Sequence, residues 1–142
     1  MPRSAENDLK EKILRAAIKL FSESGYTETT MRDIAKTLNI KAGSIYNHFS
    51  SKREILVSSY DFYVEQQRLL WPTSDELMRT AETGSIQDVL KKLDYRWPAS
   101  IEDTMHSILT IAVGRASIDE ETATFLSGNI FSGRVKRVGA RR

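Results

Sequence analysis

The segment 31–49 holds two short groups of apolar residues on either side of Asn39. Within each group the apolar side chains recur every three or four positions, which is the period of an amphipathic helix. Ala35 is small enough to let two helices approach closely, and Asn39 tolerates the left-handed backbone of a tight turn. Ile45 stands where its side chain can fill the interface between the helices. This spacing predicts a helix-turn-helix.

The outer face of the second helix in this pair, expected over about 42–49, is polar and uncharged. With Ile45 and Phe49 directed inward, the residues left outside are Ala42, Gly43, Ser44, Tyr46, Asn47 and His48. Residues 34–53 contain no Asp or Glu, as expected for a surface that faces a polyanion. Small residues at the start of the helix permit entry into a DNA major groove about 12 Å wide. The Tyr46 hydroxyl and the Lys52 ammonium are the expected phosphate contacts.

Helical periodicity extends through the rest of the chain, and no segment alternates like a strand. The fold class expected is therefore all-α, with a helix-turn-helix domain at 1–55 and a helical regulatory domain at 56–142. Capping-box pairs are Thr30/Asp33, Ser51/Glu54, Thr73/Glu76, Ser85/Asp88 and Ser100/Asp103. The helices predicted around these pairs run over about 8–24, 31–39, 42–49, 52–70, 74–83, 86–94, 101–116 and 120–130.

Charge is distributed unevenly along the 142 residues. Residues 1–56 carry 10 Lys/Arg against 7 Asp/Glu, residues 57–133 carry 6 against 12, and residues 134–142 carry 5 against none. A basic first part and an acidic second part suggest a polyanion-binding module joined to a part with a different function. The basic tail could also bind nucleic acid, although short basic tails are often only disordered ends.

The motifs LFSESGY, TTMRDIA, SIYNHF and SKREIL, within 9–56, resemble the DNA-binding domain of TetR-family (tetracycline-repressor-like) transcriptional regulators. The resemblance implies three helices for DNA binding, a fourth that leads to a helical domain for dimerisation and effector binding, and repression that a small molecule relieves. Carried over by position, the DNA contacts are Thr30, Arg32, Ser44, Tyr46, Asn47, His48 and Lys52. Asn39 replaces the usual turn glycine, and Lys41 stands where a capping Ser or Thr is common. Lysine cannot cap the third helix, but its charge could contact a phosphate instead.

Bulky residues of the second part are candidates for an effector pocket or for ordinary packing. They are Tyr60, Tyr63, Trp71, Met78, Trp97, Met105, His106 and Phe125. Family members commonly dimerise through two long helices near the C-terminus, whereas only SGRVKRVGARR follows Phe131. Either the regulatory domain is compact, or the chain is truncated or frame-altered.

The function expected is a DNA-binding regulator, acting as a repressor: a homodimer on a palindromic operator of double-stranded DNA, released by an unknown small-molecule effector. The alternative is an effector-binding or interaction module with a weak or vestigial DNA-binding head. An enzyme is not expected, because the two histidines lie 58 positions apart, cysteine is absent, and no phosphate loop or nucleophile elbow occurs. No cofactor, metal or catalytic residue is predicted. The uncharged runs are too short to span a membrane, so the cytoplasm is the expected location.

Overall fold

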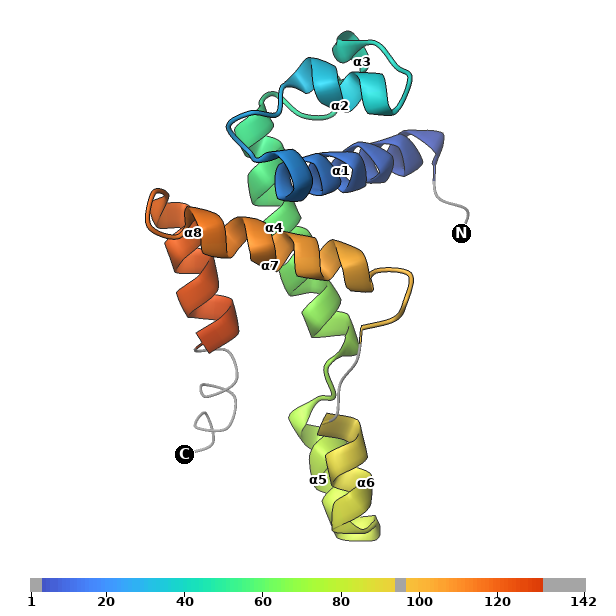
Figure 1. Ribbon diagram of the computed structural model, residues 1–142. Helices are drawn as coiled ribbons and strands as arrows, with labels where there is room; N and C mark the ends of the chain where they lie inside the picture. Colours follow the sequence, from blue (N-terminus) through green and yellow to red (C-terminus); the bar gives the residue numbers. More distant parts are fainter. Residues whose placement is uncertain (1–3, 94–96, 132–142) are drawn as a thin grey trace.

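A computed structural model describes residues 4–93 and 97–131, and every regular element in this part of the chain is a helix (Figure 1). The all-α fold class is therefore confirmed. In chain order the elements are α1 (Ala5–Ser24), α2 (Met31–Thr37), α3 (Ala42–Tyr46), α4 (Lys52–Leu70), α5 (Ser74–Thr83), α6 (Ile86–Leu93), α7 (Glu102–Arg115), α8 (Glu120–Phe125) and the π-helix η1 (Leu126–Phe131).

The first three helices form the predicted helix-turn-helix. Gly25 ends α1 with a φ of 98°, a backbone conformation that is strained for any residue with a Cβ, so glycine is strongly favoured there. Thr30 begins α2 with the predicted capping box, in which its hydroxyl accepts from the Asp33 amide and the Asp33 carboxylate accepts from the Thr30 amide. Asn39 makes the turn with a φ of 54°. The local sequence thus sets the angle between α2 and α3.

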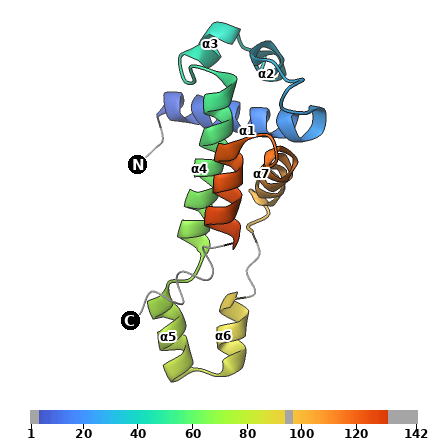
Figure 2. The same ribbon diagram turned by 90° about the vertical axis from the view of Figure 1, so that its left-hand side faces the viewer.

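Helix α4 connects this head to the remainder of the molecule. Its first half packs on α1, and α7 crosses both α1 and α4 while α8 lies beside α4 (Figure 2). Most of the residues buried between these helices are apolar: Ile13, Ala17, Ile18, Ile55, Leu56, Tyr60, Tyr63, Ile101, Met105, Ile108, Ile111, Ala112, Phe125 and Leu126. Ser59, Asp119 and Thr122 are buried with them. Because α4 is continuous across residues 55 and 56, the division into two domains at that point stays a prediction.

Helices α5 and α6 form a separate hairpin beyond the end of α4 (Figure 1). Both predicted capping boxes are present, at Thr73 with Glu76 and at Ser85 with Asp88. None of the hairpin side chains that the structure describes is buried. Ile86 and Leu90 are 71% and 56% exposed.

Several helical details differ from the predictions: α1 begins at Ala5 instead of Asp8, and α2 ends at Thr37 instead of Asn39. Helix α3 ends at Tyr46 instead of Phe49, because the chain tightens into a turn in which the His48 amide donates to the Ile45 carbonyl. At the start of α4 the Glu54 carboxylate accepts from Ser50, not Ser51, so only half of that capping box forms.

The predicted cap of α7 by Ser100 and Asp103 is wrong. Ile101 is the N-cap residue and makes no side-chain cap. The amides of Ile101 and Glu102 both donate to the Pro98 carbonyl, and this turn buries the Ile101 side chain to 8% exposure. Burial of an apolar side chain therefore sets the start of the helix here. Beyond Phe125 the helix widens into η1 in place of the α-helix predicted to residue 130.

We predict that Ile45→Ala lowers the free energy of unfolding by about 3 kcal/mol, because Ile45 is completely buried between α3 and its neighbours. Chemical denaturation followed by circular dichroism measures this loss. The adjacent change Tyr46→Ala is the matched control, since that side chain is 54% exposed. It should alter stability by less than about 0.5 kcal/mol. Equal losses of stability in the two variants would contradict the assignment of Ile45 to the core and of Tyr46 to the surface.

Candidate nucleic-acid interface

The outer face of α3 is open, as the sequence predicts. Tyr46, Asn47, Gly43 and Lys41 are exposed, and Ala42, Ser44 and His48 are half-buried. A Cβ placed on Gly43 would meet no atom within 4 Å, so the backbone of α3 is accessible at that point. Lys41 is the N-cap residue and makes no side-chain cap, so this terminus lacks the usual hydroxyl partner. The face is therefore accessible and uncharged except at its first residue.

The start of α2 lies beside this face and supplies further predicted contacts. The Arg32 side chain is exposed, whereas the Thr30 hydroxyl donates to the Asp33 carboxylate at 2.8 Å. Hydrogen bonds from the Thr30 amide and hydroxyl lower the pKa of Asp33 below its ordinary value. A DNA contact by Thr30 would therefore have to share a hydroxyl that already completes the cap.

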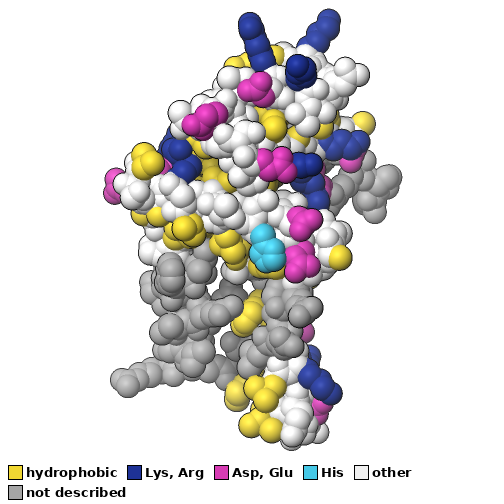
Figure 3. Space-filling model, viewed as in Figure 1, with side chains coloured by type: hydrophobic (Ala, Val, Ile, Leu, Met, Phe, Trp, Pro, Cys, Tyr) yellow, Lys and Arg dark blue, Asp and Glu magenta, His cyan; other side chains and the backbone are white. Residues whose placement is uncertain are grey.

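Basic side chains extend from the end of the molecule that α2 and α3 form (Figure 3). Arg32, Lys36 and Lys41 are exposed there. Residues 34–53 contain no Asp or Glu, but the Asp33 carboxylate at the start of α2 interacts with the charge of Lys36, so the positive charges are in excess and not unopposed. This end of the head therefore has the charge that attracts a phosphate backbone.

Lys52 occupies a position that the sequence did not predict. Its ammonium donates to the carbonyls of Tyr26 at 2.6 Å and Thr29 at 3.0 Å, and it lies 4.2 Å from the centre of the Tyr26 ring. Burial, followed by the charge of Arg115, lowers the pKa of Lys52. The ammonium thus holds the loop that leads into α2, and the predicted phosphate contact by Lys52 stays untested.

An ion pair between α4 and α8 joins the head to the rest of the molecule, and it was not predicted from the sequence. The Arg53 guanidinium donates to both Asp119 carboxylate oxygens, at 3.0 and 3.1 Å, and to Glu121 at 2.8 Å. Asp119 is the N-cap of α8, and Arg115 lies 4.0 Å from the Tyr26 ring. Asp119 carries a recognisable capping signal, but a pairing across 66 positions leaves no local trace in a sequence.

The predicted effector residues are only partly brought together. Tyr60 stacks on Phe125 with ring centres 4.4 Å apart, and Tyr63 meets Phe125 and Trp97 edge to face at 5.6 Å each. We call these four residues the aromatic cluster. Its members pack against one another, and Met105 is fully buried in the same core.

The other candidates lie apart from this cluster. Met78 is 49% exposed on the α5–α6 hairpin, outside the core that holds the aromatic cluster, and its role in effector binding stays a prediction. His106 is exposed on α7 and lines an open hollow of about 710 Å³ between α1 and α7, together with Arg15, Lys19 and Thr110. Trp71 is the half-buried C-cap of α4.

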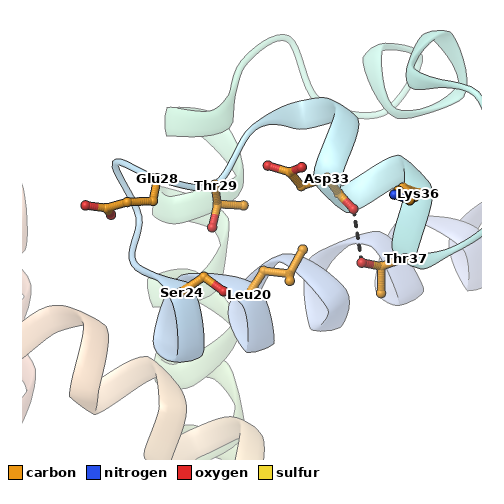
Figure 4. Close-up of a pocket in the computed structure, with 7 residues that line it drawn as sticks. All are labelled: Leu20, Ser24, Glu28, Thr29, Asp33, Lys36 and Thr37. Atoms are coloured by element: carbon orange, nitrogen blue, oxygen red, sulfur yellow. Dashed lines mark hydrogen bonds between the residues drawn. The ribbon is translucent and has the colours of Figure 1, made fainter.

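A further hollow of about 510 Å³ lies between the end of α1 and helix α2 (Figure 4). Its lining includes Glu28, Asp33, Lys36 and Thr37, and the Thr37 hydroxyl donates to the Asp33 carbonyl. Because two carboxylates and one ammonium line this hollow, its charge does not favour the binding of an anion. Among the described residues, no group of three or more His, Asp or Glu side chains could hold a metal ion.

Comparison with known proteins agrees with this geometry. Residues 13–58 match the family model described as "Bacterial regulatory proteins, tetR family". These residues form a tetR-family domain. The matched range contains α2, α3, the turn at Asn39 and the first turns of α4, so it includes the predicted interface.

Relatives of known name match the same part of the chain. "Biofilm operon icaADBC HTH-type negative transcriptional regulator IcaR" of Staphylococcus aureus (strain Newman) is 55% identical over 51 residues, which cover 36% of this chain and 27% of that protein. "Uncharacterized HTH-type transcriptional regulator YerO" of Bacillus subtilis (strain 168) is 38% identical over 58 residues, covering 41% and 20%. The match thus spans about a quarter of the length of these relatives. No helix in the described part of the chain is long and apolar enough to cross a membrane.

We predict that Lys52→Met destabilises the tetR-family domain by about 1–3 kcal/mol, because the Tyr26 and Thr29 carbonyls lose a charged donor. Thermal unfolding measures the loss. Lys41→Met is the control, since Lys41 is exposed and makes no cap. A Lys52 variant as stable as the control, with a salt dependence of DNA binding reduced by about 0.9, would show a phosphate contact instead.

We also predict that the contribution of Asp119 to stability disappears in acid. Hydrogen bonds from Arg53 hold the pKa of Asp119 well below its usual range, although burial acts in the opposite direction. Because the folded-state pKa lies below the unfolded value of about 3.9, the stabilisation is complete above that pH. It is lost as pH falls toward the folded-state pKa.

The measurement is the difference in unfolding free energy between the wild type and Asp119→Asn at a series of pH values. The difference should be constant near pH 6 and shrink below about pH 4. In a chain that carries Arg53→Met, the corresponding effect of Asp119→Asn on the unfolding free energy should depend less on pH. A difference that stays constant down to pH 2 would contradict the role of the Arg53 hydrogen bonds to Asp119, which we call the fork.

Proposed function

We propose that the protein is a transcriptional regulator that binds double-stranded DNA through α3. The observation that supports this most directly is the open, polar outer face of α3, set within a tetR-family domain. In this proposal Ser44, Asn47 and His48 contact base edges in the major groove, and Tyr46 contacts a phosphate. Arg32 and Lys41 add positive charge beside them.

A repressor is the form of regulation we propose. IcaR, which is named a negative regulator, shares 55% identity over 51 residues with this chain. A five-residue recognition helix reads few base pairs. Two copies reading half-sites about 34–36 Å apart would supply the missing specificity, which favours a homodimer on a palindromic operator. Such a regulator would act in the cytoplasm, where bacterial DNA is found.

Release by a small-molecule effector is the remaining part of this proposal. The aromatic cluster is the site we favour, because its residues come from α4, α8 and the segment before α7 and contact one another. Aromatic rings in a core give a ligand a large apolar surface. Displacement of these rings by an apolar molecule would change the position of α8.

A second candidate function is an interaction module with a weak DNA-binding head. The α5–α6 hairpin favours it, because Ile86 and Leu90 expose large apolar side chains outside the core. Contiguous exposed apolar surface is typical of binding sites for other proteins.

We predict that the wild-type chain selects specific duplexes from a random-sequence pool, with an affinity that falls steeply as salt rises. Fluorescence anisotropy on a selected duplex, at two salt concentrations, measures this affinity. Ser44→Ala and Asn47→Ala should change the preferred sequence, at a cost of about 1–3 kcal/mol for each lost base contact. Tyr46→Phe should weaken binding to all duplexes alike.

Sedimentation of the complex gives the number of chains on each duplex, which the proposal sets at two. Binding that is weak, independent of salt and unchanged in all three variants would refute DNA recognition by α3. It would favour the interaction module.

A further inference from the structure

A continuous series of hydrogen bonds connects the aromatic cluster to the first turn of α4. The hydroxyls of Tyr60 and Thr122 lie 2.7 Å apart, and Thr122 donates to the Asp119 carboxylate at 3.1 Å. Asp119 also accepts both arms of Arg53. Since the single Thr122 proton is directed to the carboxylate, the Tyr60 hydroxyl must donate to Thr122. We call Tyr60, Thr122, Asp119 and Arg53 the polar chain.

The polar chain is closed to solvent over most of its length. Thr122 is 0% exposed, Tyr60 is 4% and Asp119 is 8%. Arg53 alone is half-exposed, with 48% of its side chain accessible. A fully exposed ion pair would contribute little, but a buried carboxylate that loses its partner is left with its desolvation uncompensated. Separation of Asp119 from Arg53 would leave this carboxylate with one cation, Arg115 at 3.7 Å, so the contact can break only at a cost in stability.

The two ends of the polar chain lie at different functional positions. At one end, the Tyr60 ring stacks on Phe125 of α8, with an angle of 10° between the planes. At the other, Arg53 is the second residue of α4, shortly after α3, and its neighbour Lys52 holds the loop that begins α2. A shift of α8 relative to α4 would thus change the position of the first turn of α4, which lies next to the helix-turn-helix.

We propose that the polar chain couples the packing of α8 to the position of the recognition helix, so that DNA affinity depends on the contact between Asp119 and Arg53. This inference rests on the proposed DNA-binding function. Asp119, Thr122 and Tyr60 are positioning residues in it, because they act on DNA only through Arg53 and α4. An energetic coupling between two sites requires a contact that differs between two arrangements, and the fork from Arg53 to Asp119 can be made or broken.

Two matched variants separate the effect of the Tyr60 hydroxyl from the effect of its ring. Tyr60→Phe removes the donor to Thr122 and keeps the ring stacked on Phe125. Tyr63→Phe removes a hydroxyl from the same helix and the same aromatic cluster, but that oxygen accepts from Gln67 of α4 itself. Both side chains are buried, so the two changes carry similar costs to packing.

The first experiment measures the position of the head directly and needs no DNA. The sequence contains no cysteine. Spin labels can therefore be attached to Lys36→Cys on α2 and Thr124→Cys on α8, both of which are exposed. We expect a single narrow distance distribution by electron–electron double resonance in the otherwise unchanged chain. The distribution should broaden in Tyr60→Phe and in Asp119→Asn, and stay narrow in Tyr63→Phe.

The second experiment measures the affinity of the unlabelled full chain for a duplex selected by the wild type. Asp119→Asn should bind about 5- to 20-fold more weakly, and Tyr60→Phe about threefold, within the usual range of coupling between sites. Tyr63→Phe should bind within twofold of the wild type. The dependence on salt should be the same in all of them, because no phosphate contact is removed.

The outcomes separate this inference from the proposed function. Distance distributions that are equally narrow in all variants overturn the coupling, whether or not the chain binds DNA. A wild type that binds no duplex, with distances that still broaden in Tyr60→Phe and Asp119→Asn, refutes the DNA-binding function and supports the mechanical connection. Broadened distances with unchanged DNA affinity overturn the dependence of affinity on the fork. If Asp119→Asn fails to fold, as circular dichroism would reveal, the Tyr60→Phe and Tyr63→Phe pair still gives a decisive result.

Discussion

Burial of Ile45 and Phe49 is the constraint on which the candidate interface depends. Both side chains are almost completely inaccessible, at 0% and 1% exposure, and they lie four residues apart on one side of the segment that contains α3. Once this side is fixed against the core, the intervening Tyr46 and Asn47 must face outward. The polar surface that would meet DNA is therefore a consequence of core packing.

The first turn of α4 connects the helix-turn-helix to the rest of the molecule. Lys52 binds the carbonyls that precede α2, and Arg53 binds the carboxylate that begins α8. Two consecutive cations on one helical turn point 100° apart, so each can serve a different neighbour. The Tyr26 ring lies between Lys52 and Arg115, at 4.2 and 4.0 Å, and places a favourable π-face between two like charges. Head and body are thus joined by polar contacts as well as by the apolar core.

The sequence predicted what depends on local chemistry. The Thr30 and Thr73 capping boxes, the positive φ of Asn39 and the bounds of α5 all follow from residues a few positions apart. It failed where burial overrides the local signal, as at Ile101, where an apolar side chain takes the cap position that Ser100 was expected to fill. Pairings across 62 and 66 positions, such as Tyr60 with Thr122 and Arg53 with Asp119, depend on the tertiary arrangement of helices and have no periodic trace. The outer face of α3 was predictable because it depends on residues a few positions apart. The contact between α4 and α8 was not predictable because it depends on the tertiary arrangement of the helices.

The packing of the aromatic cluster limits how any ligand could use it. Tyr60 and Phe125 are in stacking contact, with ring centres 4.4 Å apart, so a molecule cannot enter between them unless α8 moves away from α4. A ligand shifts an equilibrium only by the difference in its affinity for two arrangements, and here it would have affinity for the displaced arrangement alone. The same displacement would stretch the hydrogen bond from Tyr60 to Thr122, whose hydroxyl is also bonded to Asp119. In the proposed mechanism, occupation of the aromatic cluster would therefore oppose the contact between Arg53 and Asp119, and a bound ligand would weaken the connection to the helix-turn-helix.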